Sequence, residues 1–256
     1  MTSNSQFDTV AKSYPSYPHV LPLREEVELH SFRVAAGDVT GLAALDLGCG
    51  AGRYAQHLAR WGAGRVVGVD DSAGMLELAQ DAEDAEPMGI TYRLADVSTD
   101  HLLDLAGTMD LVLSCYALPY APSVARLTGM FTTARTVLRE GGRFIAATLN
   151  PDYADHDIER GYYDRFNMRL TANVHPPVEG TPVHLHAWFN DPAATPIDVD
   201  AYWWSPTTYE VAAKTAGFTS LTWHHFTVSD TGVGHFGEDY WTPYLTRPHA
   251  VMLEAS

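Results

Sequence analysis

The stretch Leu45-Asp46-Leu47-Gly48-Cys49-Gly50-Ala51-Gly52 decides the fold. It ends a short apolar run, 41–47, of the kind that forms a buried strand, and the pattern predicts a helix directly after it, 53–61. Glycines at this position permit a sharp turn from strand to helix and leave room for a ligand to approach the backbone. A GxGxG motif alone is weak evidence, because many nucleotide-binding folds contain one.

The chain on both sides of this stretch alternates short apolar runs with helical patterns. The predicted strands are 66–69, 90–94, 110–114 and 143–148. The predicted helices are 23–36, 72–83, with Ser72 as its N-cap, and 124–139. Such alternation predicts a doubly wound α/β sheet, and the nearly all-apolar strands indicate cover on both faces.

The pattern changes after Asn150. Residues 151–182 are polar, aromatic and proline-rich, whereas 183–189 and 199–204 alternate with a period of two and predict an antiparallel pair of strands. A helix with Ser205 as its N-cap is expected to end at Gly217. The last two predicted strands are 218–228 and 249–254.

Composition excludes several classes of protein. The chain has 256 residues, of which 46% are hydrophobic, which fits a folded globular protein. Its formal net charge of −16 argues against nucleic acid or an anionic membrane as partner. We expect neither a membrane span nor a secretory signal. Two cysteines are too few for a disulfide scaffold, so we expect a cytoplasmic protein.

Three aspartates follow successive predicted strands. Asp70 ends the second strand, where a carboxylate can accept both hydroxyls of an unphosphorylated ribose. Asp96 ends the third, where it can accept an adenine amino proton. Asp46 lies at the end of the first, where it can meet a positive charge of the ligand or order the glycine loop. Three acids fit a cationic nucleoside without phosphate and fit a dinucleotide badly.

With these residues the chain resembles the class I S-adenosylmethionine-dependent methyltransferases of the small-molecule branch. The resemblance covers about residues 38–150 and rests on the glycine stretch, 66–75, 95–97, 110–116 and 138–146. A weaker resemblance of the C-terminal part points to bacterial toxoflavin-type N-methyltransferases. The resemblance implies a Rossmann-like seven-stranded sheet, mostly parallel with the last strand antiparallel, with helices on both faces and a small antiparallel β insertion over the active site.

The sequence pattern and the resemblance together predict a division of one domain, 1–256. A lid and helix would occupy 1–36, the cofactor-binding half 38–150, a substrate-side insertion 151–204, and a C-terminal helix with strands 205–256. The expected cofactor is S-adenosylmethionine, with S-adenosylhomocysteine as product and no metal. The expected cofactor-binding residues are Tyr14 (from the lid), Asp46, Gly48, Cys49, Gly50, Asp70, Asp71, Met75, Asp96, Val97, Ser114 and Cys115.

Some of these residues have a simpler interpretation. Asp71 fits a solvated loop as well as a cofactor contact, and Met75 fits a helix core. Cys49 and Cys115 are interpreted as small buried residues, because no feature activates either thiol.

The acceptor side is less specific. A general base, if one is needed, is expected among Tyr14, Tyr116, His184 and His186. His184 and His186 share one face of a strand, where packing or surface placement is the alternative. Arg160, Arg165 and Arg169 are spaced to share one side of a helix, either as a solvated face or as an anchor for an anionic group. The expected substrate-binding residues are these three arginines, Tyr116, Tyr162, Trp188 and Trp204.

The favoured hypothesis is methyl transfer to nitrogen or oxygen of a planar aromatic or heteroaromatic small molecule, in bacterial secondary metabolism. Aromatic side chains in the insertion suit such an acceptor. One alternative is C-methylation of an isoprenoid diphosphate held by the arginines. Another is a scaffold that binds cofactor without catalysis. A homodimer is compatible with the sequence.

Overall fold

The larger of two sheets is mostly parallel. The computed structural model describes residues 6–11, 21–152, 161–188 and 195–256. Within them, seven strands pair in the order β3-β2-β1-β4-β5-β10-β9, and β10 runs antiparallel to both of its neighbours. The strands are β1 (Ala43–Leu47), β2 (Arg65–Asp70), β3 (Thr91–Leu94), β4 (Met109–Cys115), β5 (Leu138–Leu149), β9 (Leu221–His224) and β10 (Ala250–Ala255). The predicted Rossmann-like sheet is confirmed.

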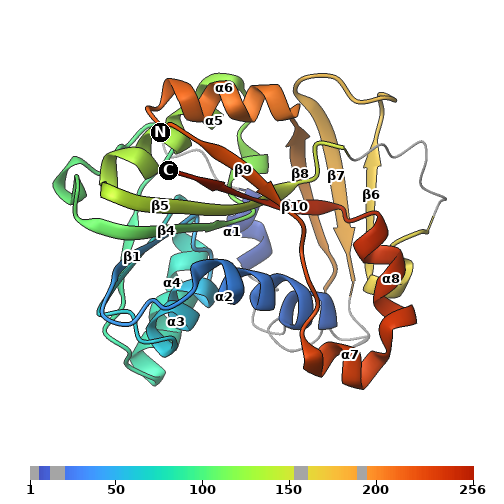
Figure 1. Ribbon diagram of the computed structural model, residues 1–256, viewed down its shortest axis with the longest axis horizontal. Helices are drawn as coiled ribbons and strands as arrows, with labels where there is room; N and C mark the ends of the chain where they lie inside the picture. The colour runs from blue at the N-terminus through green and yellow to red at the C-terminus, as the bar shows by residue number, and fades with distance from the viewer. Residues whose placement is uncertain (1–5, 12–20, 153–160, 189–194) are drawn as a thin grey trace.

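Helices cover both faces of this sheet, as predicted. Figure 1 shows α2, α3 and α4 below the sheet and α5 and α6 above it. Their bounds, with the π-helical turn η2 that precedes α2, are η2 (Arg24–Leu29), α2 (His30–Ala36), α3 (Arg53–Arg60), α4 (Ala73–Ala85), α5 (Val124–Val137) and α6 (Pro206–Thr215). Ser72, Ser123 and Ser205 cap α4, α5 and α6 by accepting a backbone N–H, as serine does at helix starts.

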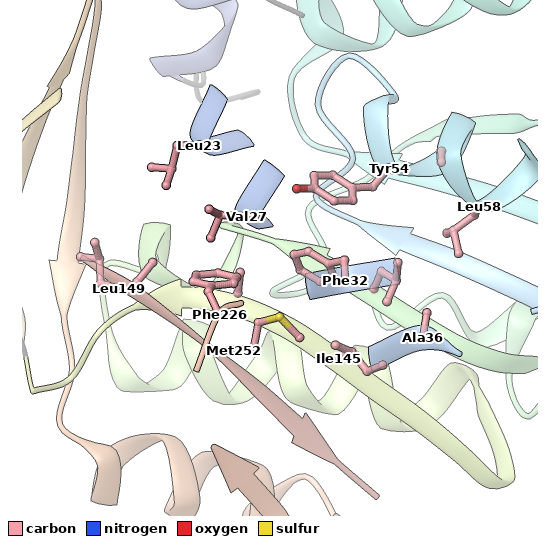
Figure 2. Close-up of a cluster of buried hydrophobic side chains, with 14 of the residues drawn as sticks. Leu23, Val27, Phe32, Ala36, Tyr54, Leu58, Ile145, Leu149, Phe226 and Met252 are labelled. Atoms are coloured by element: carbon pink, nitrogen blue, oxygen red, sulfur yellow. The ribbon is translucent and has the colours of Figure 1, made fainter. Parts of the chain in front are cut away.

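The two-residue period of the strands divides the core into two clusters. Ile145 and Ala147 of β5 face η2, α2 and α3, whereas Phe144 and Ala146 face α5 and α6. Figure 2 shows the first cluster, in which the side chains of η2, α2 and α3 meet those of β5 and β10. Both faces are apolar because both are covered, which explains why the strands read as continuous apolar runs.

A second sheet of three antiparallel strands stands beside the first (Figure 1, right). Its strands are β6 (Met168–Ala172), β7 (Thr181–Ala187) and β8 (Ile197–Trp203). The predicted pair 183–189 and 199–204 corresponds to β7 and β8, and residues 189–194 lie outside the described residues.

The expected helix carrying the arginines is wrong for the residues described. Arg165 lies in the 3₁₀ turn η6 (Asp164–Phe166), Asn167 then adopts a left-handed conformation, and Arg169 belongs to β6. The left-handed residue ends the turn and starts an extended strand, so the two arginines share no helical face. Arg160 lies outside the described residues.

Two short helices, α7 (Asp230–Phe236) and α8 (Glu238–Thr246), fill the connection between β9 and β10, where the sequence pattern predicted no element. The first of the two predicted C-terminal strands is shorter than expected, and β9 has only four residues. No helix within the described residues is long and apolar enough to span a bilayer.

Phe32 tests the first core cluster. Its side chain is 0% exposed and its ring lies 4.9 Å from that of Tyr54. Phe32→Ala should lower the free energy of unfolding by about 3–5 kcal/mol, because it leaves a cavity between helix and sheet. Val34→Ala is the matched control, since Val34 lies on the same helix and is 64% exposed. Urea unfolding of both variants measures the difference, and equal losses would contradict this packing.

Candidate functional site

A cavity of about 410 Å³ lies at the carboxyl ends of β1, β2 and β4. This is the edge at which open α/β sheets bind ligands, and the volume is in the range of small-molecule sites, roughly 300–1,000 Å³. The loops after these three strands form one side of the cavity, and the three-stranded sheet forms the other.

The glycine loop forms the floor of the first side. The N–H groups of Gly48 and Cys49 both donate to the carbonyl of Val69, at 2.8 and 3.0 Å, which ties the loop to β2. Gly48 has a φ of +75°, and a Cβ on it would clash with Ala117. At Gly50 a Cβ would meet nothing within 4 Å, and this residue lines the cavity. The loop therefore offers bare backbone to a ligand.

Asp46 orders this loop and does not line the cavity. The carboxylate accepts the backbone N–H of Ala55 in α3 at 2.9 Å and is buried. Burial raises the pKa of Asp46 to about 7, against the lowering effect of this hydrogen bond. Of the two roles expected for Asp46, facing a positive charge of the ligand or ordering the glycine loop, the structure favours the second, because the carboxylate fixes the start of α3, where the loop ends.

Asp70 lines the cavity, and its carboxylate binds the glycine loop at Gly50. One carboxylate oxygen accepts Gly50 N–H at 2.8 Å and the other accepts Ser72 N–H at 2.9 Å. Burial raises the pKa of Asp70 to about 6, while backbone hydrogen bonds from Ser72, Gly50 and Asp71 lower it. Because each oxygen keeps a further lone pair, the carboxylate can still accept from a ligand.

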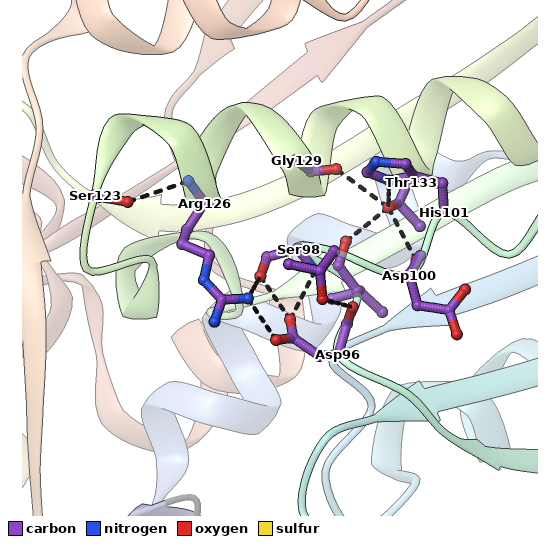
Figure 3. Close-up of polar contacts among 10 residues, drawn as sticks. Asp96, Ser98, Asp100, His101, Ser123, Arg126, Gly129 and Thr133 are labelled. Atoms are coloured by element: carbon purple, nitrogen blue, oxygen red, sulfur yellow. Dashed lines mark hydrogen bonds and ion pairs between the residues drawn. The ribbon is translucent and has the colours of Figure 1, made fainter. Parts of the chain in front are cut away.

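Asp96 lies in a polar cluster at the end of β3 (Figure 3). It accepts the N–H of Ser98 at 3.0 Å and pairs with the Arg126 guanidinium at 2.5 Å. Burial acts to raise the pKa of Asp96, but the hydrogen bonds from Ser98 and Arg126 hold it below its usual value. All three residues line the cavity, so a ligand here meets Arg126 together with Asp96.

The structure brings most of the expected cofactor residues to this cavity. Those that line it are Gly48, Cys49, Gly50, Asp70, Asp71, Met75, Asp96, Val97 and Cys115. Ser114 does not, since its hydroxyl is buried and donates to the carbonyl of Leu47 at 2.9 Å. Tyr14 lies outside the described residues.

The short helix α1 (Gln6–Ala11) joins the two sides of the cavity. Asp8 accepts the Ser72 hydroxyl at 2.6 Å, beside the N-terminus of α4. Gln6 exchanges two hydrogen bonds of 3.0 Å with the backbone of Asp200 in β8. The helix is therefore bound both to the start of α4 and to β8 of the three-stranded sheet.

The second side of the cavity is aliphatic. The inner face of the three-stranded sheet contributes Met168, Leu170, Val183, Leu185, Ala187, Ile197, Val199 and Ala201. In the register of the sheet, Val183 pairs with Ala201 and Leu185 with Val199, so these side chains share one face. The aromatic side chains that the sequence analysis considered for the acceptor, Trp188 and Trp204, are not among them.

The two tryptophans and the two described arginines expected at the acceptor side, Arg165 and Arg169, lie elsewhere. Trp204 is buried in the core between the sheet and α6, where its indole N–H donates to Ala121. Trp188 packs against Arg169, whose guanidinium pairs with Asp164. None of these side chains lines the cavity, and neither do Tyr162 and Arg165.

The two histidines of β7 face away from the cavity. His184 is 45% exposed and bonds Asp200 and Asp198, and His186 bonds Asp198. The hydrogen bond to Asp200 raises the pKa of His184, against a small opposing effect of burial. The two-residue period that places Val183 and Leu185 inside places both histidines outside. They therefore do not reach a ligand in the cavity.

Tyr116 is the expected acceptor-side residue that does line the cavity. Its backbone φ is +64°, and its hydroxyl donates to Glu28 of η2 at 2.6 Å. The same hydroxyl lies 3.5 Å from Nε2 of His249, whose Nδ1 lies 3.0 Å from the hydroxyl of Tyr244. Burial lowers the pKa of His249 to about 3, with the charge of Arg24 acting in the same direction, so the imidazole is neutral at pH 7.

Sequence reasoning missed Glu28, Arg24 and His249, all of which line the cavity. One signal was present: Glu28 interrupts a helical stripe of apolar residues that includes Leu23 and Val27. An acid on the buried side of an amphipathic helix needs a partner in the core.

Comparison with known proteins agrees with this geometry. Residues 44–142 match the family described as a methyltransferase domain. A solved S-adenosylmethionine-dependent methyltransferase from Mesorhizobium loti has a TM-score of 0.61 and 24% identity, over 89% of this chain and 96% of that one. The CcbJ methyltransferase of Streptomyces caelestis has a TM-score of 0.65 and 21% identity, over 99% and 98%. Both likenesses concern the fold.

Residues 44–142 thus match a methyltransferase domain, and the seven-stranded sheet to which they contribute has the fold of the class I S-adenosylmethionine-dependent methyltransferases. A similar curated protein is the ubiquinone biosynthesis O-methyltransferase of Methylocella silvestris, 36% identical over 118 residues. The aligned part is 46% of this chain and 44% of that protein, so the chain spans less than half of this relative.

Gly48 provides a test of the loop geometry. Gly48→Ala should lower the free energy of unfolding by clearly more than Gly89→Ala. Both residues have a positive φ, for which a Cβ costs roughly 1–2 kcal/mol, but only the Cβ at position 48 would also clash with Ala117. Chemical unfolding measures both losses. Equal values would mean that the loop is not held against the segment after β4.

Proposed function

We propose that this protein transfers a methyl group from S-adenosylmethionine to a hydroxyl of a small molecule with an apolar body. One observation carries the proposal. A single cavity has a loop of bare backbone and carboxylates on one side and an aliphatic wall on the other, and Tyr116 also lines it.

The first side of the cavity fits the methyl donor. Asp70 would accept the ribose hydroxyls, and Asp96 with Val97 and Met75 would surround the adenine. The open backbone at Gly50 leaves space for the methionine part. When bound, the sulfonium supplies an already activated methyl group, so the chain mainly has to align the partners and exclude water.

The second side supports an apolar acceptor. Aliphatic side chains give affinity by burial and make few directional contacts, which fits an alkyl or prenyl body better than a polar heteroaromatic one. The partial likeness to a ubiquinone biosynthesis O-methyltransferase supports oxygen as the acceptor atom. The net charge of −16 supports a small molecule over a nucleic acid.

The alternatives have less support. C-methylation of an isoprenoid diphosphate depended on three arginines, and the two described, Arg165 and Arg169, lie outside the cavity lining. A non-catalytic scaffold has no need of a cavity that continues past the cofactor residues to an aliphatic wall.

The direct test is to incubate the protein with S-adenosylmethionine and 4-hexylphenol and to detect S-adenosylhomocysteine and the methyl ether by mass spectrometry. 4-Hexylaniline is the matched amine. Turnover of the phenol supports the proposal. Turnover of the amine alone would move the acceptor atom to nitrogen, and turnover of neither would contradict the proposed acceptor class.

Asp70 tests the donor side. Asp70→Ala should weaken binding of S-adenosylhomocysteine by about 1.5–3 kcal/mol, the scale of hydrogen bonds to a charged group. Asp81→Ala is the control, because Asp81 is exposed on α4 outside the cavity lining. Isothermal titration calorimetry measures both. An unchanged affinity for Asp70→Ala would mean that the ribose binds elsewhere.

Val199 tests the aliphatic wall. Val199→Asn should raise the KM for 4-hexylphenol by roughly 5- to 150-fold, because an amide in this wall has no partner and costs about 1–3 kcal/mol. The affinity for S-adenosylhomocysteine should stay unchanged. Asp198→Asn, at the next residue but on the exposed face, should leave KM unchanged. A KM that responds equally to both variants would exclude this face as the acceptor wall.

A further inference from the structure

Glu28 is a buried carboxylate at the edge of an apolar cavity. It is 2% exposed and belongs to η2, whose neighbouring side chains Leu23 and Val27 are core residues. Burying a charged group is unfavourable unless it is paired and hydrogen-bonded. A buried acid that lines a ligand cavity is a candidate for a functional role.

Two contacts hold the Glu28 carboxylate. Oε1 accepts the hydroxyl of Tyr116 at 2.6 Å, and Oε2 lies 3.4 Å from Nε of Arg24, one helical turn away. Because Tyr116 donates its proton to Glu28, the lone pairs of its oxygen remain available to accept a proton from another donor. His249 also approaches this oxygen, at 3.5 Å.

Tyr116 occupies the position between the two sides of the cavity. It follows β4 directly, and the next residue, Ala117, lies against Gly48 of the glycine loop. Tyr116, Glu28 and His249 share the cavity lining with Leu149 and Leu185 of the apolar side. A hydroxyl of an acceptor seated on the aliphatic wall would therefore meet the Tyr116 oxygen beside Glu28 and His249. The next residue, Ala117, borders the loop that receives the methyl donor.

We propose that Tyr116 is a catalytic residue that accepts the proton of the acceptor hydroxyl, and that Glu28 is the positioning residue that receives the tyrosine's own proton. This proposal rests on the proposed function. As the acceptor oxygen bonds to the methyl carbon, the carbon–sulfur bond breaks and sulfur keeps the electron pair. The acceptor proton moves to Tyr116, and the original Tyr116 proton moves to Glu28. After product release, Glu28 returns this proton to solvent.

The charges around this pair are consistent with such a relay. Burial, reinforced by the charge of Glu28, raises the pKa of Tyr116 well above its usual value. The phenol therefore keeps a proton at rest and passes it on only as another arrives. The guanidinium of Arg24 lies 3.4 Å from Glu28 Oε2, and the neutral His249 adds no charge. The histidines of β7, the other expected proton acceptors in the described residues, face outward.

The test compares two acceptors of similar shape and different acidity. 4-Hexylphenol keeps its proton at mildly alkaline pH, whereas 4-hexyl-2,6-difluorophenol is ionised there and needs no base. Glu28→Gln and Tyr116→Phe should each lower kcat for 4-hexylphenol by about 10²–10⁴-fold, the usual contribution of general base catalysis. Neither variant should lower kcat substantially for the difluorophenol. Glu77→Gln, an exposed change on α4, should leave both rates as they are.

The outcomes distinguish a failure of the proton relay from a failure of the proposed function on which it rests. Equal losses of kcat for both phenols would overturn the relay and leave Glu28 and Tyr116 with a structural role. No turnover of either phenol by the wild-type protein would overturn the proposed acceptor class and the relay with it. S-adenosylhomocysteine affinity and thermal unfolding of each variant show whether the fold and the donor side are intact. If Glu28→Gln fails to fold, Tyr116→Phe alone decides, because it removes the relay and leaves the carboxylate paired with Arg24.

Discussion

The close approach of Gly48 to Ala117 is the constraint on which the rest of the site depends. β1 and β4 are neighbours in the sheet, with Asp46 opposite Leu113, so the segments that follow them leave the sheet side by side. They can touch only because Gly48 has no side chain. Tyr116 directly precedes Ala117 in the chain, so this contact brings the backbone of Tyr116 near the glycine loop. It thereby sets the separation between the donor side and the acceptor side of the cavity.

The second sheet controls what the acceptor meets. Its inner face is aliphatic and its outer face carries His184, Asp198 and Asp200, which bond one another at the surface. A polar group brought against the inner face finds no partner among these outward side chains. It can be satisfied by polar residues elsewhere in the cavity lining, among them Glu28, Tyr116 and His249. The aliphatic wall thus directs an acceptor's polar group away from the three-stranded sheet.

Local sequence pattern predicted those parts of the molecule that depend on neighbours in the chain. The parallel strands, the turn at Gly48, the acids at the strand ends and the Ser72 cap were all read from short segments. Glu28 was not predicted as a site residue because its partner Tyr116 is 88 positions away in the chain. His249 was not predicted for the same reason, since it is 133 positions from Tyr116. Such contacts arise only when the fold is complete.

The expectation that His184 or His186 faces the ligand was wrong for a different reason. It rested on the ability of histidine to accept a proton, but burial of Val183, Leu185 and Ala187 is more favourable than burial of the histidines. When one face of a strand must be inside, apolar area decides which. The polar set then takes the solvent side even where it carries titratable groups. The strand β6 was overlooked because Asn167 turns the chain only one residue before it begins, and the preceding residues suggested a helix.

The backbone at Tyr116 supports a positional role for its side chain. A φ of +64° is rare for a residue other than glycine, asparagine or aspartate, and such strain costs about 1–3 kcal/mol. Glycine there would remove the strain and also the hydroxyl. The conformation is held by the hydrogen bond from Tyr116 N–H to Ala147 at 3.0 Å and by the phenol's bond to Glu28. These two contacts fix both the backbone and the side chain of Tyr116 in the cavity, between its donor side and its acceptor side. A proton acceptor needs such a fixed orientation toward the group that gives up the proton.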